Sequence, residues 1–254
     1  MRMRALVAKG LVVLCGFAVS ACVAGGPLRA RDTKVETRAL DPGGSFSLEI
    51  VNGRVTLTTW DEPRVRIEAD RAARSEEGLR ELRVEIEGDG RRVSVRTRTP
   101  RGFRFAGRGG RVDYHVTLPA DAEVRVSTVN GRIEIEGLTG AVRASTTNGR
   151  VEITGAGGEV DASVVNGRIN ARYRVLDPDA HHRFSVTNGS IAVAVPEGSG
   201  GRLEARTVNG GVDSDLDLES TQRRGRKRLE GRLGNGRGSI ELRTVNGGIR
   251  LRRS

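Results

Sequence analysis

Hydrophobic and polar residues alternate along most of this 254-residue chain, as they do in strands that bury one face and solvate the other. Val124 and Val126 lie on one face, Ile133 and Ile135 continue that face past a turn, and mostly Arg, Ser and Glu occupy the positions between them. A helical period competes only briefly, over residues 71–82, a stretch that we expect to link two strands. The pattern therefore predicts an all-β domain.

Asn-Gly pairs interrupt this alternation and keep phase with one another. Three of them lie 18 residues apart, namely Asn130-Gly131, Asn148-Gly149 and Asn166-Gly167. Four more occur at looser spacing, at residues 52–53, 188–189, 209–210 and 246–247, and a second Gly-rich turn recurs at residues 137–140 and 155–158. A fixed period of roughly 20 residues is typical of stacked repeats, in which each unit buries its apolar face against its neighbours.

Two architectures fit this repeat. Asn-Gly is the strongest short signal for a two-residue hairpin, because both positions accept a positive φ, and serial hairpins would give an antiparallel meander. Alternatively, each pair marks a corner of a parallel β-solenoid with two strands per rung. The same residues point inward in both architectures, so the alternation does not distinguish them. The in-phase spacing favours the solenoid, since identical Asn side chains would then form a hydrogen-bonded ladder along the axis.

The first 21 residues predict the compartment. Basic residues precede an apolar run over residues 11–19 that is too short to span a bilayer, which is typical of a signal peptide. The segment ends Val-Ser-Ala-Cys at residues 19–22, which resembles a bacterial lipobox. The resemblance implies that Cys22 carries several acyl chains, a stable membrane anchor. Because Val23 rather than an aspartate follows, it also implies sorting to the outer membrane, facing the periplasm or the surface.

Composition excludes several classes of chemistry from the mature domain. Cys15 lies in the signal peptide and Cys22 carries the lipid, which leaves no cysteine for disulfides, thiol catalysis or metal binding. Removing residues 1–21 takes away three basic residues and no acidic one, so the net charge falls from +11 to +8. A basic surface favours anionic partners. Nucleic acid is disfavoured by the compartment and by an aromatic content of 3%.

Several segments resemble the DUF4097 family of adhesin-like bacterial envelope proteins. They are residues 47–55, the Thr59-Trp60-Asp61 that follows, residues 114–119 and the serial Val-Asn-Gly units up to residue 251. The resemblance covers about residues 35–254 and implies a single β-solenoid, with an irregular N-terminal portion before the regular rungs. The family has no general assigned activity. We therefore expect a signal peptide at 1–21, a lipidated linker at 22–34 and a solenoid domain at 35–254.

Two groups of side chains invite a catalytic or metal-binding interpretation. His181-His182 lies close to acidic residues, but adjacent residues on an extended chain point to opposite faces, so one metal ion cannot easily take both. Asp113-Tyr114-His115 alternates with apolar residues, as residues of a structural strand do. We expect neither a catalytic site, nor a metal site, nor a cofactor.

A run of acids and a cluster of bases have two interpretations each. Asp213, Asp215 and Asp217, with Glu219 next, either bind Ca²⁺ or pair with Arg250 and Arg252 if the units at 209 and 246 stack; we favour pairing. The densest basic cluster leaves the repeat pattern and is expected to protrude. It either binds phosphate groups of envelope lipids or glycans, or is a solvated loop. Its residues are Arg223, Arg224, Arg226, Lys227 and Arg228.

The sequence favours a lipid-anchored, non-enzymatic envelope protein that acts as an adhesin-like scaffold or binding surface. One alternative is an enzyme that acts on polysaccharide, such as a lyase, because β-helices often carry that chemistry. Such an enzyme needs a unique carboxylate cluster in a groove, whereas this chain repeats its residues from rung to rung. A second alternative is an envelope-stress sensor that binds anionic lipid or peptide. The sequence specifies no protein partner.

Overall fold

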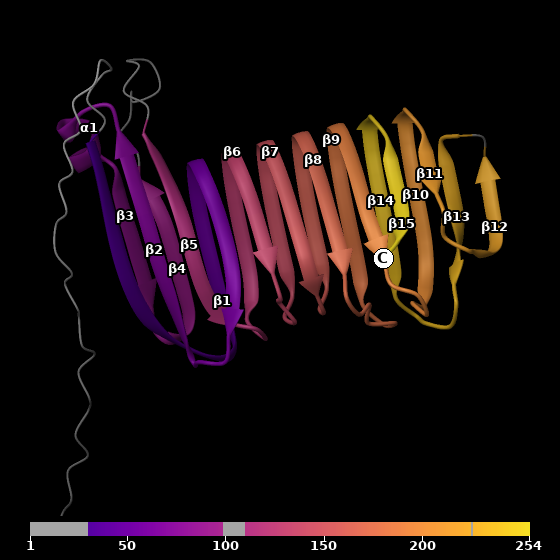
Figure 1. The fold of residues 1–254 in the computed structure, drawn as a ribbon, viewed down its shortest axis with the longest axis horizontal. Coiled ribbons are helices and arrows are strands. Elements are labelled where there is room, and N and C mark those ends of the chain that lie inside the picture. The colour runs from indigo at the N-terminus through magenta and orange to yellow at the C-terminus, as the bar shows by residue number, and fades with distance from the viewer. Residues whose placement is uncertain (1–29, 99–109, 225) are drawn as a thin grey trace, which may run out of the picture.

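The structure of the protein is a computed structural model that describes residues 30–98, 110–224 and 226–254, without the side chains of 220–224. The described residues form one helix and fifteen strands, which join in a single hydrogen-bonded sheet wound on itself (Figure 1). The elements are β1 (Ala30–Trp60), β2 (Arg64–Ala73), α1 (Glu76–Glu81), β3 (Arg83–Gly88), β4 (Gly90–Arg98), β5 (Arg111–Pro119), β6 (Glu123–Glu136), β7 (Val142–Ala156), β8 (Val160–Tyr173), β9 (His181–Val195), β10 (Gly201–Asn209), β11 (Val212–Ser214), β12 (Glu219–Arg224), β13 (Arg228–Leu233), β14 (Ser239–Asn246) and β15 (Ile249–Arg253).

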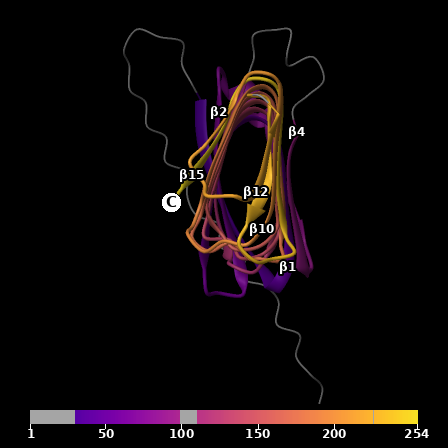
Figure 2. The same ribbon diagram turned by 90° about the vertical axis from the view of Figure 1, so that its right-hand side faces the viewer.

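The predicted β-solenoid is confirmed, and the antiparallel meander is wrong. β6, β7, β8 and β9 pair in parallel, with Asn130 opposite Asn148 and Asn148 opposite Asn166. Each strand bends at its Asn-Gly pair, so one element supplies two half-strands and makes one rung. Viewed along the axis, the rungs superimpose as a flattened oval (Figure 2). The outward residues before the Asn-Gly corner make up what we call the first face, and those after it make up the second face.

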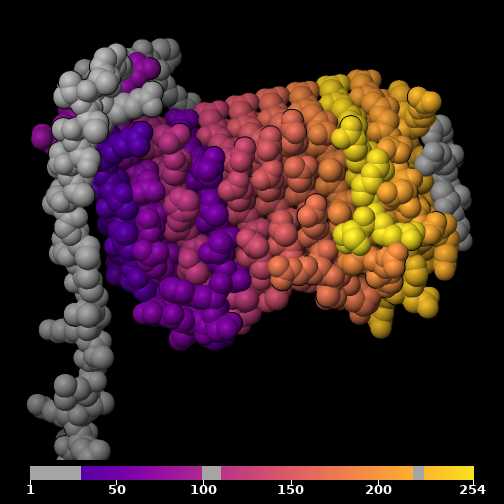
Figure 3. Space-filling model, in the orientation of Figure 1, coloured from indigo at the N-terminus to yellow at the C-terminus, as the bar shows by residue number. Residues whose placement is uncertain are grey.

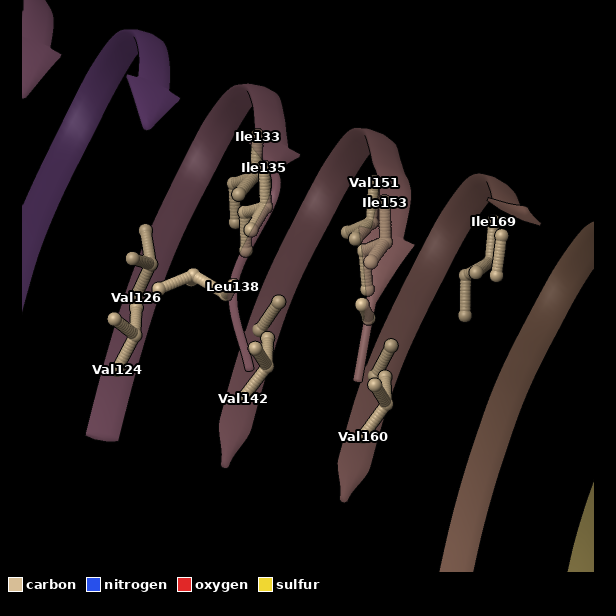
Figure 4. Packing of buried hydrophobic residues seen from close by; sticks show 14 of the residues in the cluster. Val124, Val126, Ile133, Ile135, Leu138, Val142, Val151, Ile153, Val160 and Ile169 are labelled. Carbon is tan, nitrogen blue, oxygen red and sulfur yellow. The ribbon is translucent and has the colours of Figure 1, made fainter. Parts of the chain in front are cut away.

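The inward residues of successive rungs form apolar columns, as the alternation predicts. Val124, Val142 and Val160 are at most 3% exposed, and so are Ile133, Val151 and Ile169 after the corner. Figure 4 shows these side chains turned toward the space between the two half-strands. The core is thin because β-branched and small residues fill it. This suits a chain with few aromatic residues.

The corners require glycine because successive rungs approach closely there. A Cβ on Gly149 would lie 1.7 Å from the carbonyl oxygen of Gly131, and one on Gly167 equally close to that of Gly149. Gly149 and Gly167 also have φ values of 155° and 148°, which other residues rarely adopt. Gly131 has no such φ, yet its Cβ would lie 1.9 Å from the carbonyl oxygen of Gly53. Close backbone approach, more than a left-handed conformation, explains the glycines.

The asparagines of the corners form the expected ladder. Every side-chain amide except that of Asn52 donates to the amide oxygen of the Asn in the neighbouring rung, at 2.8–2.9 Å. Along the axis the order is Asn52, Asn130, Asn148, Asn166, Asn188, Asn246 and Asn209. Six such bonds join seven rungs and hold them in register.

The N-terminal end of the stack is irregular, as the family resemblance implies. β1 pairs in succession with β2, β4, β6 and β5, antiparallel with the first and parallel with the others. Residues 30–34, which we expected to lie in the linker, belong to β1. The weak helical signal over residues 71–82 corresponds to the end of β2 and the short helix α1, which links β2 to β3.

The rungs at the other end do not stack in chain order. β14 and β15 lie between β9 on one side and β10 and β11 on the other. The hairpin of β12 and β13 then covers β10 at the end of the sheet. Chain order predicts that the Asn246-Gly247 corner lies at the end of the stack, and this prediction is wrong. A Cβ on Gly247 would lie 1.6 Å from the carbonyl oxygen of Gly189, and Gly210 packs on its other side.

Candidate functional site

Several predicted features lie outside the described residues. They are the signal peptide at 1–21, the lipidation site Cys22 and the first part of the linker. In the part of the chain that the structure describes, no helix is long and apolar enough to cross a membrane.

The two adjacent histidines point in opposite directions. His181 is exposed, and its Nδ1 lies 3.0 Å from the hydroxyl of Ser239. His182 is 2% exposed, and its Nδ1 lies 2.9 Å from the hydroxyl of Tyr173. Burial lowers the pKa of His182 to about 4 and keeps the ring neutral. Among the described residues, no group of three or more His, Cys, Asp or Glu side chains is placed to hold a metal ion.

Asp113, Tyr114 and His115 lie on β5, at the N-terminal end of the stack, and their side chains do not point toward one another. Tyr114 is fully buried, its hydroxyl lies 2.7 Å from that of Thr97, and burial raises its pKa to about 12. His115 points to the exposed side of the same strand. The Asp113 carboxylate accepts a hydrogen bond from the backbone N–H of Arg54 at 2.9 Å, beside the first corner. The three side chains therefore have separate structural roles.

The row of acids pairs with arginines, as favoured. β11 lies parallel to β15, with Asp213 opposite Arg250. The closest ion pair lies two residues further along β15 than this register: Arg252 contacts Asp213 at 2.6 Å and Asp215 at 3.8 Å. Arg253 contacts Asp217 at 2.5 Å and Glu197 at 3.0 Å. Stacking of the units at 209 and 246 thus brings acids and bases together.

The basic cluster lies at the turn between β12 and β13. The side chains of Arg223 and Arg224 are outside the described set. The backbone does not protrude freely, since the carbonyls of Arg226 and Lys227 accept hydrogen bonds from the N–H groups of Val212 and Thr207 at 2.8 and 2.9 Å. Arg228 is paired with Glu230. Exposed charge in the described part of this cluster therefore comes from Arg226 and Lys227.

The first face has a broad groove with mixed charge. The groove has a volume of about 800 Å³ and runs across the starts of the rungs from β1 to β14. Arg125, Arg143 and Arg183 line it together with Glu159 and Asp161, so neither sign dominates.

An uncharged strip runs beside this groove along the corners. It consists of a serine column, a column of Val and Thr, and the asparagine ladder. The serines are Ser127, Ser145, Ser163 and Ser185, and the second column is Val51, Val129, Thr147, Val165, Thr187, Val245 and Val208. Val165, Val208 and Val245 are 43–54% exposed, so the strip presents apolar side chains to solvent.

Comparison with known proteins assigns the fold to a family. The family model described as Toastrack DUF4097 matches residues 113–252, more than half of the chain. The chain belongs to this family. The Toastrack match runs from β5 to β15 and so includes every regular rung after β1, together with the inserted pair β14 and β15. Among curated proteins, no relative matches the sequence.

One solved structure agrees with the Toastrack assignment at the level of the fold. A protein from Clostridium sporogenes named as a "putative cell adhesion protein" superposes with a TM-score of 0.51 at 14% identity, over 88% of this chain and all of that one. A "putative adhesin" from Bacteroides fragilis aligns over 86% of this chain and 97% of that one, with a TM-score of 0.30 at 10% identity. At such identities, similarity extends to the fold alone.

Sequence reasoning missed one basic area on the second face of this Toastrack domain. Arg168 and Arg172 on β8 lie across β9 from Arg250 and Arg252 on β15. A break in the repeat is the signal that could have revealed it. The first two regular rungs read Arg-x-Glu after the corner, at residues 132–134 and 150–152, whereas the third reads Arg-x-Asn at 168–170.

Proposed function

We propose that this chain is a lipid-anchored, non-enzymatic envelope protein whose solenoid serves as an adhesin-like binding surface. The uncharged strip is the observation that carries the proposal. Its asparagine ladder and its column of Val and Thr cross seven rungs and, at about 4.8 Å per rung, are about 29 Å long, and the serines add a third column over the four rungs from β6 to β9. Side chains that repeat in register over this length suit the recognition of an extended partner.

Three further observations support this proposal. The residues with catalytic appearance have separate structural partners, and the row of acids is neutralised by arginines. The lipobox-like segment ending at Cys22 supplies a means of attachment to the membrane. The Clostridium sporogenes protein of similar fold carries a name that refers to cell adhesion. The exposed Arg226 and Lys227 add a basic end to the surface, where phosphate groups of envelope lipids or glycans would bind.

Expression in a non-adherent bacterial host that processes lipoproteins tests both the membrane anchor and the adhesin-like function. Cells that make the wild-type chain should be retained on polysaccharide-coated plates, and cells that make Cys22→Ser should not, because the variant lacks the acyl anchor. In fractionation, the wild-type chain should sediment with membranes, whereas Cys22→Ser should be soluble or remain uncleaved. Equal membrane partitioning of the two would refute the anchor. Retention of wild-type cells no greater than that of vector-only cells would refute the adhesin-like function.

A further inference from the structure

On the second face, the first two regular rungs neutralise their own charge. Arg132 contacts Glu134 at 3.1 Å, and Arg150 contacts Glu152 at 3.1 Å, each pair two residues apart on one strand. An arginine of this kind has its guanidinium already occupied by a carboxylate. This part of the face therefore has little capacity for another anion.

The next rung has the same arginine without its acid. Arg168 lies in register with Arg150, but Asn170 stands where Glu152 stands, and Arg172 adds a second positive charge two residues later. Both arginines are exposed, and neither forms an ion pair with another described residue within 4.0 Å. The charge that the repeat balances in β6 and β7 is thus unbalanced in β8.

Short side chains follow in β9. Ser190, Ala192 and Ala194 lie in register with the three outward residues of β8. On their other side, Arg250 lies opposite Ala192 and Arg252 opposite Ala194. Figure 3 shows this face, with β15 in yellow beside the orange strand β9. A row of small residues therefore runs between two strands that carry arginines, whose backbones are roughly 9.6 Å apart, twice the spacing of paired strands.

We propose that an acidic polysaccharide binds along β9, between the arginines of β8 and those of β15. Arg168, Arg172 and Arg250 supply guanidinium groups, which bind carboxylate or phosphate oxygens in a bidentate manner. Ser190 and Asn170 supply a hydroxyl and an amide for the sugar hydroxyls. Ala192 and Ala194 let the chain approach the sheet. The site adds a second surface, with a stated ligand class, to the proposed adhesin-like solenoid, and rests on that function.

The distribution of charge along the axis favours a narrow chain over a membrane. On one side of the basic area lie Glu134 and Glu136, and on the other lie Asp213 and Asp215. Arg132 and Arg252 already pair with acids of these two rows, so a flat anionic bilayer laid over the whole face would gain attraction only from the area around β9. A single polymer chain that runs along β9 contacts the arginines and stays clear of both acidic rows.

The test is the binding of the purified full chain in detergent to polygalacturonate, with neutral dextran as the control polymer. The double variant Arg168→Gln/Arg172→Gln keeps hydrogen-bonding side chains and removes two charges. Arg125→Gln/Arg143→Gln removes two exposed charges from the first face and is the matched control. The first variant should weaken polygalacturonate binding at least tenfold. The control should change it less than about twofold, and dextran should not bind. Ala192→Glu should abolish binding by placing a carboxylate between the arginines.

The outcomes separate this site from the broader function. Equal losses in the two double variants would mean that net charge alone attracts the polymer, which would overturn the site. Absence of polygalacturonate binding, or binding only to phosphatidylglycerol vesicles, would overturn it as well. If wild-type cells adhere to coated plates and Arg168→Gln/Arg172→Gln cells adhere equally, the adhesin-like function stands and the site is wrong. If the purified chain binds as expected and cells do not adhere, the site stands and the function is wrong.

Discussion

Burial of His182 should make the stability of the domain depend on pH. The ring occupies an inward column in register with Val160 and Ile240, where the other residues are apolar. Its Nδ1 is paired with the hydroxyl of Tyr173, and its Nε2 has no partner among the described residues. Desolvation lowers the pKa to about 4; the nearby Asp177 opposes this shift and His181 adds to it. Protonation would place an unmatched charge in the core.

The sign and size follow from linkage. The folded-state pKa of about 4 lies below the value of 6.5 for an unperturbed histidine, so the unfolded chain binds more protons between these values. Stability is fully present above pH 6.5 and is lost as the pH falls toward 4. From these two pKa values, the free energy of unfolding should fall by about 2 kcal/mol between pH 7.5 and pH 5, and by about 3 kcal/mol once the pH is below 4.

Urea melts followed by circular dichroism at pH 7.5 and pH 5 measure this loss. The informative variant is His182→Val/Tyr173→Phe, which restores an apolar column and removes the hydroxyl that the histidine satisfies. Tyr173→Phe alone is the control, because it keeps the buried imidazole. Wild type and the control should both lose stability at pH 5, and the double variant should lose about 2 kcal/mol less. An equal loss in wild type and double variant would refute the assignment of this pH dependence to His182.

The corners, the faces and the buried hydroxyls give three further predictions for the free energy of unfolding. Gly247→Ala should destabilise the domain by about 1 kcal/mol or more, because the backbone must shift to admit the Cβ. Gly248→Ala, whose Cβ would lie 3.6 Å from the carbonyl oxygen of Gly211, should cost far less; equal costs would refute close approach as the cause. Val151→Asp should cost several kcal/mol, and Glu152→Gln on the outer face under about 0.5 kcal/mol. Similar melting temperatures for the two variants would mean that the assignment of inward and outward faces is wrong. Thr146→Val should be neutral or stabilising by up to about 1 kcal/mol, because its buried hydroxyl has no partner among the described residues and the next rungs carry valine there; a clear loss of stability would show that the hydroxyl is satisfied.

Periodicity made the rungs predictable, because each residue of a repeat meets its own equivalent. The alternation around Val124 and Ile133 defined the inward columns, and the phase of the Asn-Gly pairs defined the ladder. The order of the last rungs was not predictable in this way. Residues 207–212 and 244–249 are nearly the same, so either unit could pack against β9. The hairpin of β12 and β13, which has no repeat signal, covers β10 and leaves the place beside β9 to β14.

The candidate site was less predictable than the fold for a related reason. Outward residues are not constrained by packing, so their identities follow function and charge balance, which periodicity does not report. The acidic row could be assigned because stacking alone brings Asp213 close to the arginines of β15. The basic area around β9 needed the order of the strands, since Arg172 and Arg252 are 80 positions apart in the chain and become neighbours of Ala194 only in the folded stack.

The insertion of β14 and β15 between earlier strands has a consequence for how the chain matures. If the polypeptide is threaded across a membrane from its N-terminus, β10 and β11 emerge before the strands that separate them from β9. Were β10 to dock on β9 at once, the nearly identical corner at Asn209 would occupy the place that belongs to Asn246. β14 and β15, which emerge last, must then displace β10 from β9 or find the position beside β9 still free. Residues 239–253 also connect the two parts of the stack. A protease that removed them would detach β10 to β13 from β9 and the rungs before it.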